Sequence, residues 1–126
     1  MAQASVLFVD DDAELAAMLC ALAQHQGWQP RAAATGHAAD AALAAELPQL
    51  VVLDMLLPDA HGADLCRRWR LQYPGLHILV LSASEPPWLA GGYDHAGADG
   101  WLTKPVPRGE LLAQCRRLLA PVQGGV

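Results

Sequence analysis

Basic residues are scarce in this chain of 126 amino acids. Lysine occurs once, at position 104, and lysine and arginine together number 8 against 13 aspartates and glutamates, for a formal net charge of -5. A protein that binds nucleic acid directly needs a basic stripe for the phosphate backbone, and this composition does not supply one. We therefore expect no direct binding of nucleic acid by this chain.

Cysteines and long apolar stretches are also few. Cys20, Cys66 and Cys115 are far apart in segments with a helical pattern, so neither a disulfide framework nor a thiolate metal site is indicated. The first apolar run has no basic flank and stops at Asp10, which argues against a signal peptide and a membrane span. These features predict a soluble cytoplasmic protein with no membrane partner.

Short apolar runs are what the sequence does contain. Residues 6–9, 50–53 and 78–81 are uninterrupted Val, Ile, Leu and Phe, as in strands buried on both faces of a parallel sheet. A weaker strand at 29–34 has little β preference, and we place it at a sheet edge. At 53% hydrophobic, the chain suits one domain over residues 1–126, with 120–126 as a tail or the start of a linker.

Helical patterns alternate with these strands. Their apolar stripes should pack onto the sheet, and they consist of Leu15, Met18, Leu19 and Leu22, of Leu65 with Trp69, and of Leu111, Cys115, Leu118 and Leu119. Asp12 and Thr35 are suited to cap two of the helices. A further helix over 88–96 would be marginal, because it contains two glycines. Alternation of this kind predicts an α/β fold with a parallel sheet between helices.

Acidic residues follow two of the apolar strands. Asp10 and Asp11 end the first, Asp54 ends the third, and Lys104 comes shortly after the last apolar step. Because the carboxyl ends of parallel strands meet in one crevice, these four side chains should converge. Capping a helix needs only one acid, and the others would repel each other unless they shared a cation. Oxygen ligands without His or Cys partners favour Mg²⁺, or a similar ion such as Mn²⁺, and hence phosphoryl chemistry.

Four motifs together resemble the receiver domain of two-component response regulators over about residues 5–119. They are Val6 to Asp12, Val51 to Asp59 with Gly62, Leu81-Ser82-Ala83, and Leu102-Thr103-Lys104-Pro105. The resemblance implies a flavodoxin-like (βα)5 fold, doubly wound, with strand order 2-1-3-4-5 and five helices. It also implies that the protein is a signalling switch and not an enzyme. The only reactions expected of it are the self-catalysed transfer of a phosphoryl group to its own aspartate and the slow loss of that group.

The resemblance assigns roles to particular residues. Asp54 would accept the phosphoryl group, and Ser82, Lys104 and the amide of Ala83 would hold its oxygens. The Mg²⁺ ligands would be the side chains of Asp11 and Asp54, the backbone carbonyl of Leu56, and Asp10 through a water. The donor would be a sensor histidine kinase, a phosphotransfer protein or a small acyl phosphate. A downstream protein would bind the face made by the segment 88–96, the last strand and the last helix; a homodimer is left open.

Some positions depart from the family pattern or need separate interpretation. Ser82 and Trp101 would form the switch, but Trp101 is bulkier than the usual Tyr or Phe, and we expect it to rotate less on activation. Leu56 and Ser84 flank the expected path of the hydrolytic water, and leucine cannot orient a water, so we expect a long-lived aspartyl phosphate. A cis bond before Pro105 suits the turn after the last strand.

Two other functions could use a similar set of residues. A phosphohydrolase of the haloacid dehalogenase type also uses aspartates, a hydroxyl, a lysine and Mg²⁺, but Glu14 stands where its D-x-D-x-T/V motif needs Thr or Val. The other rival is a receiver-like interaction module that is never phosphorylated. Histidines are expected at the surface or at helix caps. Solvated helix faces best explain the arginines at 67, 68, 70, 116 and 117.

Overall fold

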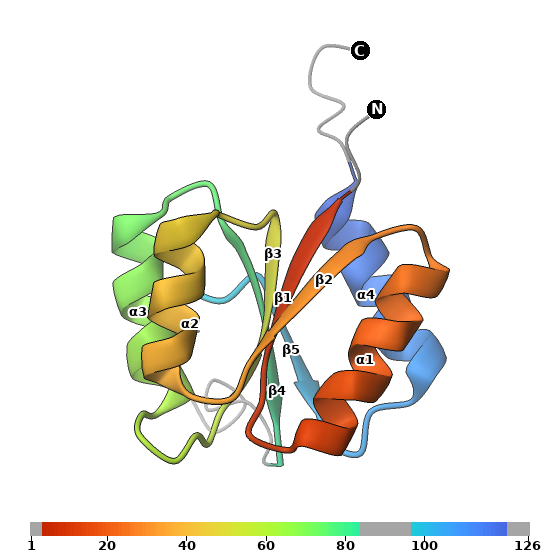
Figure 1. The fold of residues 1–126 in the computed structure, drawn as a ribbon, viewed down its shortest axis with the longest axis horizontal. Helices are drawn as coiled ribbons and strands as arrows, with labels where there is room; N and C mark the ends of the chain where they lie inside the picture. Colours follow the sequence, from red (N-terminus) through yellow and green to blue (C-terminus); the bar gives the residue numbers. More distant parts are fainter. Residues whose placement is uncertain (1–3, 84–96, 121–126) are drawn as a thin grey trace, which may run out of the picture.

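A five-stranded parallel sheet with helices on both faces forms the molecule (Figure 1), as the sequence predicts. The computed structural model describes residues 4–83 and 97–120. The strand order is β2-β1-β3-β4-β5. The strands are β1 (Ser5–Val9), β2 (Gln29–Ala33), β3 (Leu50–Asp54), β4 (His77–Ser82) and β5 (Gly100–Thr103). The helices are α1 (Ala13–His25), α2 (Gly36–Ala45), α3 (Gly62–Gln72) and α4 (Arg108–Leu119). The predicted helix over 88–96 lies outside the described residues.

Each face of the sheet has its own hydrophobic core. Helices α2 and α3 cover one face and α1 and α4 the other (Figure 1). Alternate residues of β1 face opposite cores: Leu7 packs with α2 and α3, and Val6 packs with α1 and α4. This burial of both faces explains the unbroken apolar runs. In the described part of the chain, no helix has the length and apolar character needed to cross a membrane.

One member of the predicted stripe on α1 is placed wrongly by the sequence pattern. Leu19 is buried against the sheet, but Met18 is 46% exposed. Met18 is adjacent to Leu19 in sequence and is therefore turned about 100° away around the helix. The other two predicted stripes pack as expected: Leu65, Trp69, Leu111, Cys115 and Leu118 are buried, and Leu119 is partly buried against the same core as Leu118.

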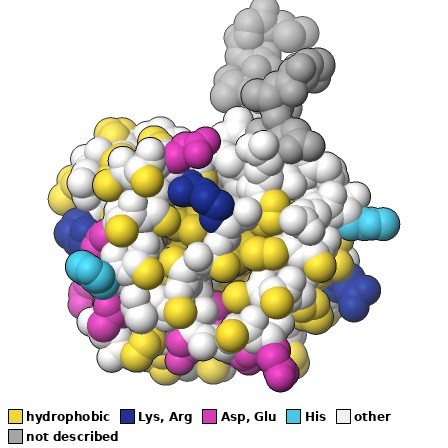
Figure 2. All heavy atoms as spheres, viewed as in Figure 1, with side chains coloured by type: hydrophobic (Ala, Val, Ile, Leu, Met, Phe, Trp, Pro, Cys, Tyr) yellow, Lys and Arg dark blue, Asp and Glu magenta, His cyan; other side chains and the backbone are white. Residues whose placement is uncertain are grey.

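The edge strand β2 carries a proline. The amide of Gln29 donates to the carbonyl of Ala4, and the carbonyl of Ala33 accepts from the amide of Asp10, so the odd-numbered residues of β2 face β1. The nitrogen of Pro30 therefore faces away from the sheet, where a strand edge would otherwise offer an N–H group. Figure 2 shows this side of the molecule, where apolar side chains are interspersed with both acidic and basic ones.

Side chains cap three of the helices. Asp12 accepts hydrogen bonds from the amides of Glu14 and Leu15 at the start of α1, and Thr35 accepts one from the amide of Ala38 in α2. Both caps confirm the sequence prediction. The His61 ring accepts a longer hydrogen bond, 3.4 Å, from the amide of Ala63 in α3, which is consistent with a capping histidine. The caps fix where each helix begins after the strand that precedes it.

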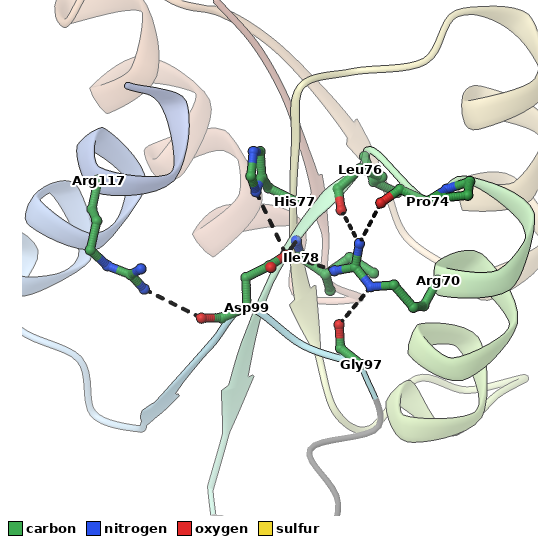
Figure 3. A network of polar contacts seen from close by, with 8 residues as sticks. All are labelled: Arg70, Pro74, Leu76, His77, Ile78, Gly97, Asp99 and Arg117. Carbon is green, nitrogen blue, oxygen red and sulfur yellow. Dashed lines mark hydrogen bonds and ion pairs between the residues drawn. The ribbon is translucent and has the colours of Figure 1, made fainter. Parts of the chain in front are cut away.

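Arg70 ties the amino ends of β4 and β5 together (Figure 3), whereas Asp10 and Asp54 follow the carboxyl ends of β1 and β3. Its guanidinium donates to the carboxylate of Asp99 at 2.7 Å and to the carbonyls of Gly97, Pro74 and Leu76. Asp99 also accepts from the amide of Ile78. The prediction that Arg70 belongs to a solvated helix face is therefore wrong. Its guanidinium instead donates to backbone carbonyls in the segments that lead into β4 and β5.

Candidate functional site

Three carboxylates meet at the carboxyl ends of β1 and β3. The register places Val9 opposite Leu53, so Asp10 and Asp54, the next residue of each strand, come side by side. One carboxylate oxygen from each of Asp10, Asp11 and Asp54 lies within 4.8 Å of the others. Asp10 and Asp54 are buried, and Asp11 is exposed. The predicted convergence of the three acids is therefore present in the structure.

Local hydrogen bonding separates the roles of the acids in the β1–α1 turn. Asp12 caps α1, and its own amide donates to the Oδ1 atom of Asp10 at 2.9 Å. The Oδ2 atom of Asp10 is buried and has no hydrogen-bond partner within the described residues. Its nearest cation is the ammonium of Lys104, at 3.6 Å. A buried carboxylate oxygen without a hydrogen bond is costly unless an ion satisfies it.

Lys104 reaches the acids from the turn after β5. Its Nζ atom lies 3.2 Å from the Oδ1 atom of Asp54, close enough for a hydrogen bond as well as an ion pair. The amide of Lys104 donates to the carbonyl of Ser82, which extends the pairing of β4 with β5 by one step. The Lys104–Pro105 peptide bond is cis. Among the described residues, Lys104 supplies the only cationic side chain in contact with Asp54.

Burial and neighbouring charges act together on the Asp10 carboxyl. Burial raises the pKa of the Asp10 carboxyl, and the nearby charge of Asp54 acts in the same direction. The hydrogen bond from the amide of Asp12 and the charge of Lys104 oppose these effects without cancelling them. The ionised form of the Asp10 carboxyl is therefore disfavoured in the folded chain, and a further positive charge beside it would stabilise that form.

The donor set fits a hard divalent cation. The available ligands are carboxylate oxygens, with no thiolate or imidazole among the clustered groups, which is the ligand chemistry of Mg²⁺ and Mn²⁺. The unpartnered Oδ2 atom of Asp10 points to the same conclusion. The residues present are thus compatible with the cation that the sequence predicts.

The other predicted site residues occupy the strand ends and loops around the acids. Ser82 ends β4, where it is buried, and Ala83 follows it at the surface. Leu56 lies in the β3–α3 loop with its side chain 65% exposed. Trp101 in β5 is half-buried and packs against the core beneath α2 and α3. Ser84 lies outside the described residues.

Sequence reasoning missed one residue beside the site. Asp59, in the β3–α3 loop, accepts hydrogen bonds from the amides of Gly36 and His37 at the start of α2. These bonds lower the pKa of Asp59, that from Gly36 most strongly. The partners are more than twenty positions apart, so no local sequence signal connects them. In the sequence, Asp59 stands out only as a member of the motif Val51 to Asp59.

A model of the response regulator receiver domain family matches residues 6–116. This chain belongs to that family. Receiver domains are the phosphorylation-activated switches of two-component systems, and the fold and the acidic cluster agree with that function. Neither the phosphohydrolase nor the phosphorylation-independent module is favoured by these findings.

Individual relatives agree with the family assignment. The chain is 36% identical over 115 residues to the probable transcriptional regulatory protein TcrX of Mycobacterium tuberculosis, covering 91% of this chain and 49% of TcrX. It therefore spans about half the length of this curated relative. The structure of Vibrio cholerae chemotaxis protein CheY4 matches with a TM-score of 0.84 and 30% identity, covering 94% of this receiver domain and 100% of CheY4.

A solved structure of an activated relative is also similar. The BeF3-activated N-terminal receiver domain of Klebsiella pneumoniae RstA matches with a TM-score of 0.80 and 30% identity. The match covers 93% of this chain and 99% of the RstA domain. The fold of this receiver domain is thus shared with a chemotaxis protein and with the N-terminal domain of RstA.

Proposed function

We propose that Asp54 is the phosphoacceptor of this receiver domain. The observation that carries the proposal is the contact of 3.2 Å between the ammonium of Lys104 and a carboxylate oxygen of Asp54, in an acidic cluster of which Asp10 and Asp54 are buried. Asp54 ends the central strand β3, so its position is fixed by neighbouring strands on both sides. A nucleophile held rigidly beside a positive charge is the arrangement that phosphoryl transfer requires.

The transfer needs no further covalent chemistry from the protein. An oxygen of the Asp54 carboxylate forms a bond to phosphorus while the bond from phosphorus to the donor breaks. With a phosphohistidine donor, the electron pair of the broken P–N bond returns to the imidazole; with acetyl phosphate, acetate leaves. Lys104 keeps its protons and turns its ammonium to the phosphoryl oxygens, where negative charge is greatest. The hydroxyl of Ser82 and the amide of Ala83 donate to the same oxygens.

The side chains of Asp11 and Asp54 would hold Mg²⁺ or Mn²⁺, together with the backbone carbonyl of Leu56 and with Asp10 acting through a water. When bound, the cation neutralises charge on the phosphoryl oxygens and reduces the repulsion between them and the carboxylates. The chain's own contribution is to gather three carboxylates that repel one another, and to keep Lys104 beside Asp54.

An apolar groove beside the site would receive the donor protein. The groove, of about 590 Å³, lies between α1 and the start of α4, and its wall includes Lys104. Its apolar lining includes Leu15, Met18, Leu22, Pro105 and Val106. A phosphohistidine protein docked there would bring its imidazole to Asp54 past Lys104. We expect Met18→Glu to slow transfer from a phosphohistidine protein and to leave transfer from acetyl phosphate unchanged.

The output would be a change in partner binding on the side formed by β5 and α4. Ser82 and Thr103 are register partners, and Trp101 lies two residues before Thr103 in β5. A shift of Ser82 toward a phosphoryl group therefore acts directly on the strand that carries Trp101. A downstream protein that binds the two positions of this strand with different affinity then reads the phosphorylation state.

Incubation with Mg²⁺ and acetyl phosphate, followed by intact mass measurement, tests the proposal. The wild-type chain should gain one phosphoryl group, and Asp54→Ala should gain none. Asp64→Ala is the matched control, because the Asp64 side chain is 80% exposed on α3, and this variant should be labelled like wild type. Sustained phosphate release would indicate a phosphohydrolase, and an unlabelled wild type would indicate an inert module.

A further inference from the structure

Asp59 fastens the β3–α3 loop, residues 55–61, to the start of α2. One carboxylate oxygen accepts a hydrogen bond from the amide of Gly36 at 2.7 Å, and the other accepts one from the amide of His37 at 2.9 Å. The first amides of a helix have no partner within the helix, so they are available to an external acceptor. Bonds from two amides to an ionised carboxylate are stronger than neutral ones. The loop after the phosphoacceptor strand is thus anchored to a different element.

Helix α2 does not depend on Asp59 alone for its cap. The hydroxyl of Thr35 accepts from the amide of Ala38 at 3.0 Å, so the helix has one cap from its own preceding residue and one from the β3–α3 loop. Thr35 makes no hydrogen bond to the β3–α3 loop among those the structure describes. The two caps can therefore be removed separately, and only the loss of Asp59 releases the loop.

The β3–α3 loop packs against the start of α2 and is also closed by hydrogen bonds within it. A side chain at Gly36 would place its Cβ atom 2.9 Å from the Cβ atom of Ala60, so the loop lies directly against the helix start. Within the loop, the amide of Leu57 donates to the carbonyl of Ala60 at 3.2 Å, and the amide of Gly62 donates to the carbonyl of Met55 at 2.6 Å. These two backbone bonds close the loop on itself.

Leu56 lies inside this closed loop. Its backbone pairs with that of His61 in an isolated antiparallel bridge, while its side chain is 65% exposed. An exposed side chain cannot fix the position of a residue by packing. The orientation of the Leu56 carbonyl is therefore set by the backbone bonds of the loop and by the anchor that holds the loop in place.

We propose that Asp59 is a positioning residue for the divalent cation: by holding the β3–α3 loop on α2, it keeps the backbone carbonyl of Leu56 directed at the acidic cluster. This inference rests on the proposed function, in which that carbonyl is a cation ligand. Asp59 is not one of the three clustered carboxylates that would bind the cation directly. Groups that orient a ligand from behind commonly change metal affinity by about tenfold or more.

Mn²⁺ binding, measured by electron paramagnetic resonance of the free ion, tests the inference without any phosphoryl donor. We expect Asp59→Ala to bind Mn²⁺ roughly tenfold more weakly than wild type. Asp59→Asn retains one acceptor oxygen, so its Mn²⁺ affinity should lie between those of wild type and Asp59→Ala. Thr35→Ala is the matched control: it also removes a cap from α2, lowers stability in EDTA, and should bind Mn²⁺ within about twofold of wild type.

A spectroscopic readout separates positioning from general loss of stability. Addition of Mg²⁺ should shift the carbonyl ¹³C resonance of Leu56 in wild type and in Thr35→Ala, and should shift it much less in Asp59→Ala. Equal Mn²⁺ affinity in Asp59→Ala and Thr35→Ala would overturn the inference and leave the proposed function intact. A wild-type chain that binds no Mn²⁺ would overturn the proposed cation site, and the role of Asp59 with it.

Discussion

The ammonium nitrogen of Lys104 lies 3.2 Å from a carboxylate oxygen of Asp54, although fifty residues separate them in the sequence. Removing the ammonium should slow phosphoryl transfer while leaving the nucleophile in place. We expect Lys104→Met to be labelled by acetyl phosphate roughly 100-fold more slowly than wild type, the effect typical of losing one donor to a developing charge. The measurement is a mass-spectrometric time course at saturating Mg²⁺.

Arg67→Met is the control for that experiment, since it removes one positive charge from α3. It should be labelled at the wild-type rate. If Lys104→Met were labelled as fast as Arg67→Met, the contact between Lys104 and Asp54 would have no role in the transfer.

The acidic cluster should destabilise the metal-free domain in a pH-dependent way. Burial, together with the charge of Asp54, raises the pKa of Asp10 in the folded state above its unfolded value. The folded state therefore binds a proton more tightly, and the contribution of Asp10 to stability is largest below its unfolded pKa, about 3.9, and is lost as pH rises through the folded pKa. At pH 7 in EDTA, Asp10→Asn should unfold roughly 3–6 °C higher than wild type.

The gain from Asp10→Asn should shrink as the pH falls toward about 4, because Asp10 is then increasingly protonated in both states. Saturating Mg²⁺ should reverse the order, since the variant lacks a ligand charge. Asp64→Asn, on the exposed surface of α3, should show no comparable gain at any pH. A pH-independent gain from Asp10→Asn would contradict the explanation by burial.

Asp40 in α2 should contribute to stability mainly through its hydrogen bond to the buried Trp69 of α3, and less through its exposed ion pair with Arg68. The indole nitrogen of Trp69, a fully buried side chain, donates to Asp40 at 2.8 Å, and Arg68 forms a two-bond ion pair with the same carboxylate. Asp40→Ala leaves the indole N–H unpaired and should cost roughly 2 kcal/mol of unfolding free energy in urea titration. Arg68→Ala removes only the half-exposed ion pair and should cost less than about 1 kcal/mol.

The aspartyl phosphate should be long-lived because Leu56 cannot orient a water. Its side chain is 65% exposed beside the site and offers no hydrogen-bonding group. We expect a phosphoryl lifetime of minutes or longer, and a shorter one in Leu56→Asn, measured as decay of the phosphorylated mass after removal of the donor. Leu71→Asn is the control, since Leu71 is 84% exposed at the end of α3 away from the site. A wild-type lifetime of seconds would count against this prediction.

Much of the fold could be predicted because its signals are local. Apolar runs define the central strands, Arg31 and the alanines that follow it mark the weak edge strand, and Asp12 and Thr35 are recognisable caps. The convergence of Asp10, Asp54 and Lys104 also followed from sequence, because in a parallel sheet the carboxyl ends of strands lie together whatever their distance along the chain.

The features that sequence reasoning missed are specific long-range pairings. Arg70 bonds to Asp99, and Asp59 bonds to the start of α2. Both pairings join segments that are distant in the sequence and meet only in the folded structure. Such positions are set by packing, and any exposed acid would satisfy the sequence pattern equally well. The exposure of Met18 was missed for a different reason: a helical stripe has a finite width, and an apolar residue at its margin can face a groove.

Pro30 has a consequence for the behaviour of many copies of this domain at high concentration. An open sheet edge is a template onto which a strand from another molecule can add, and repeated addition leads to fibres. In β2, only Ala32 is left to offer an outward amide, because the other outward position is a proline. The edge of the sheet at β2 therefore lacks one of the two N–H groups that an added strand would need. This missing donor at Pro30 disfavours polymerisation through that edge.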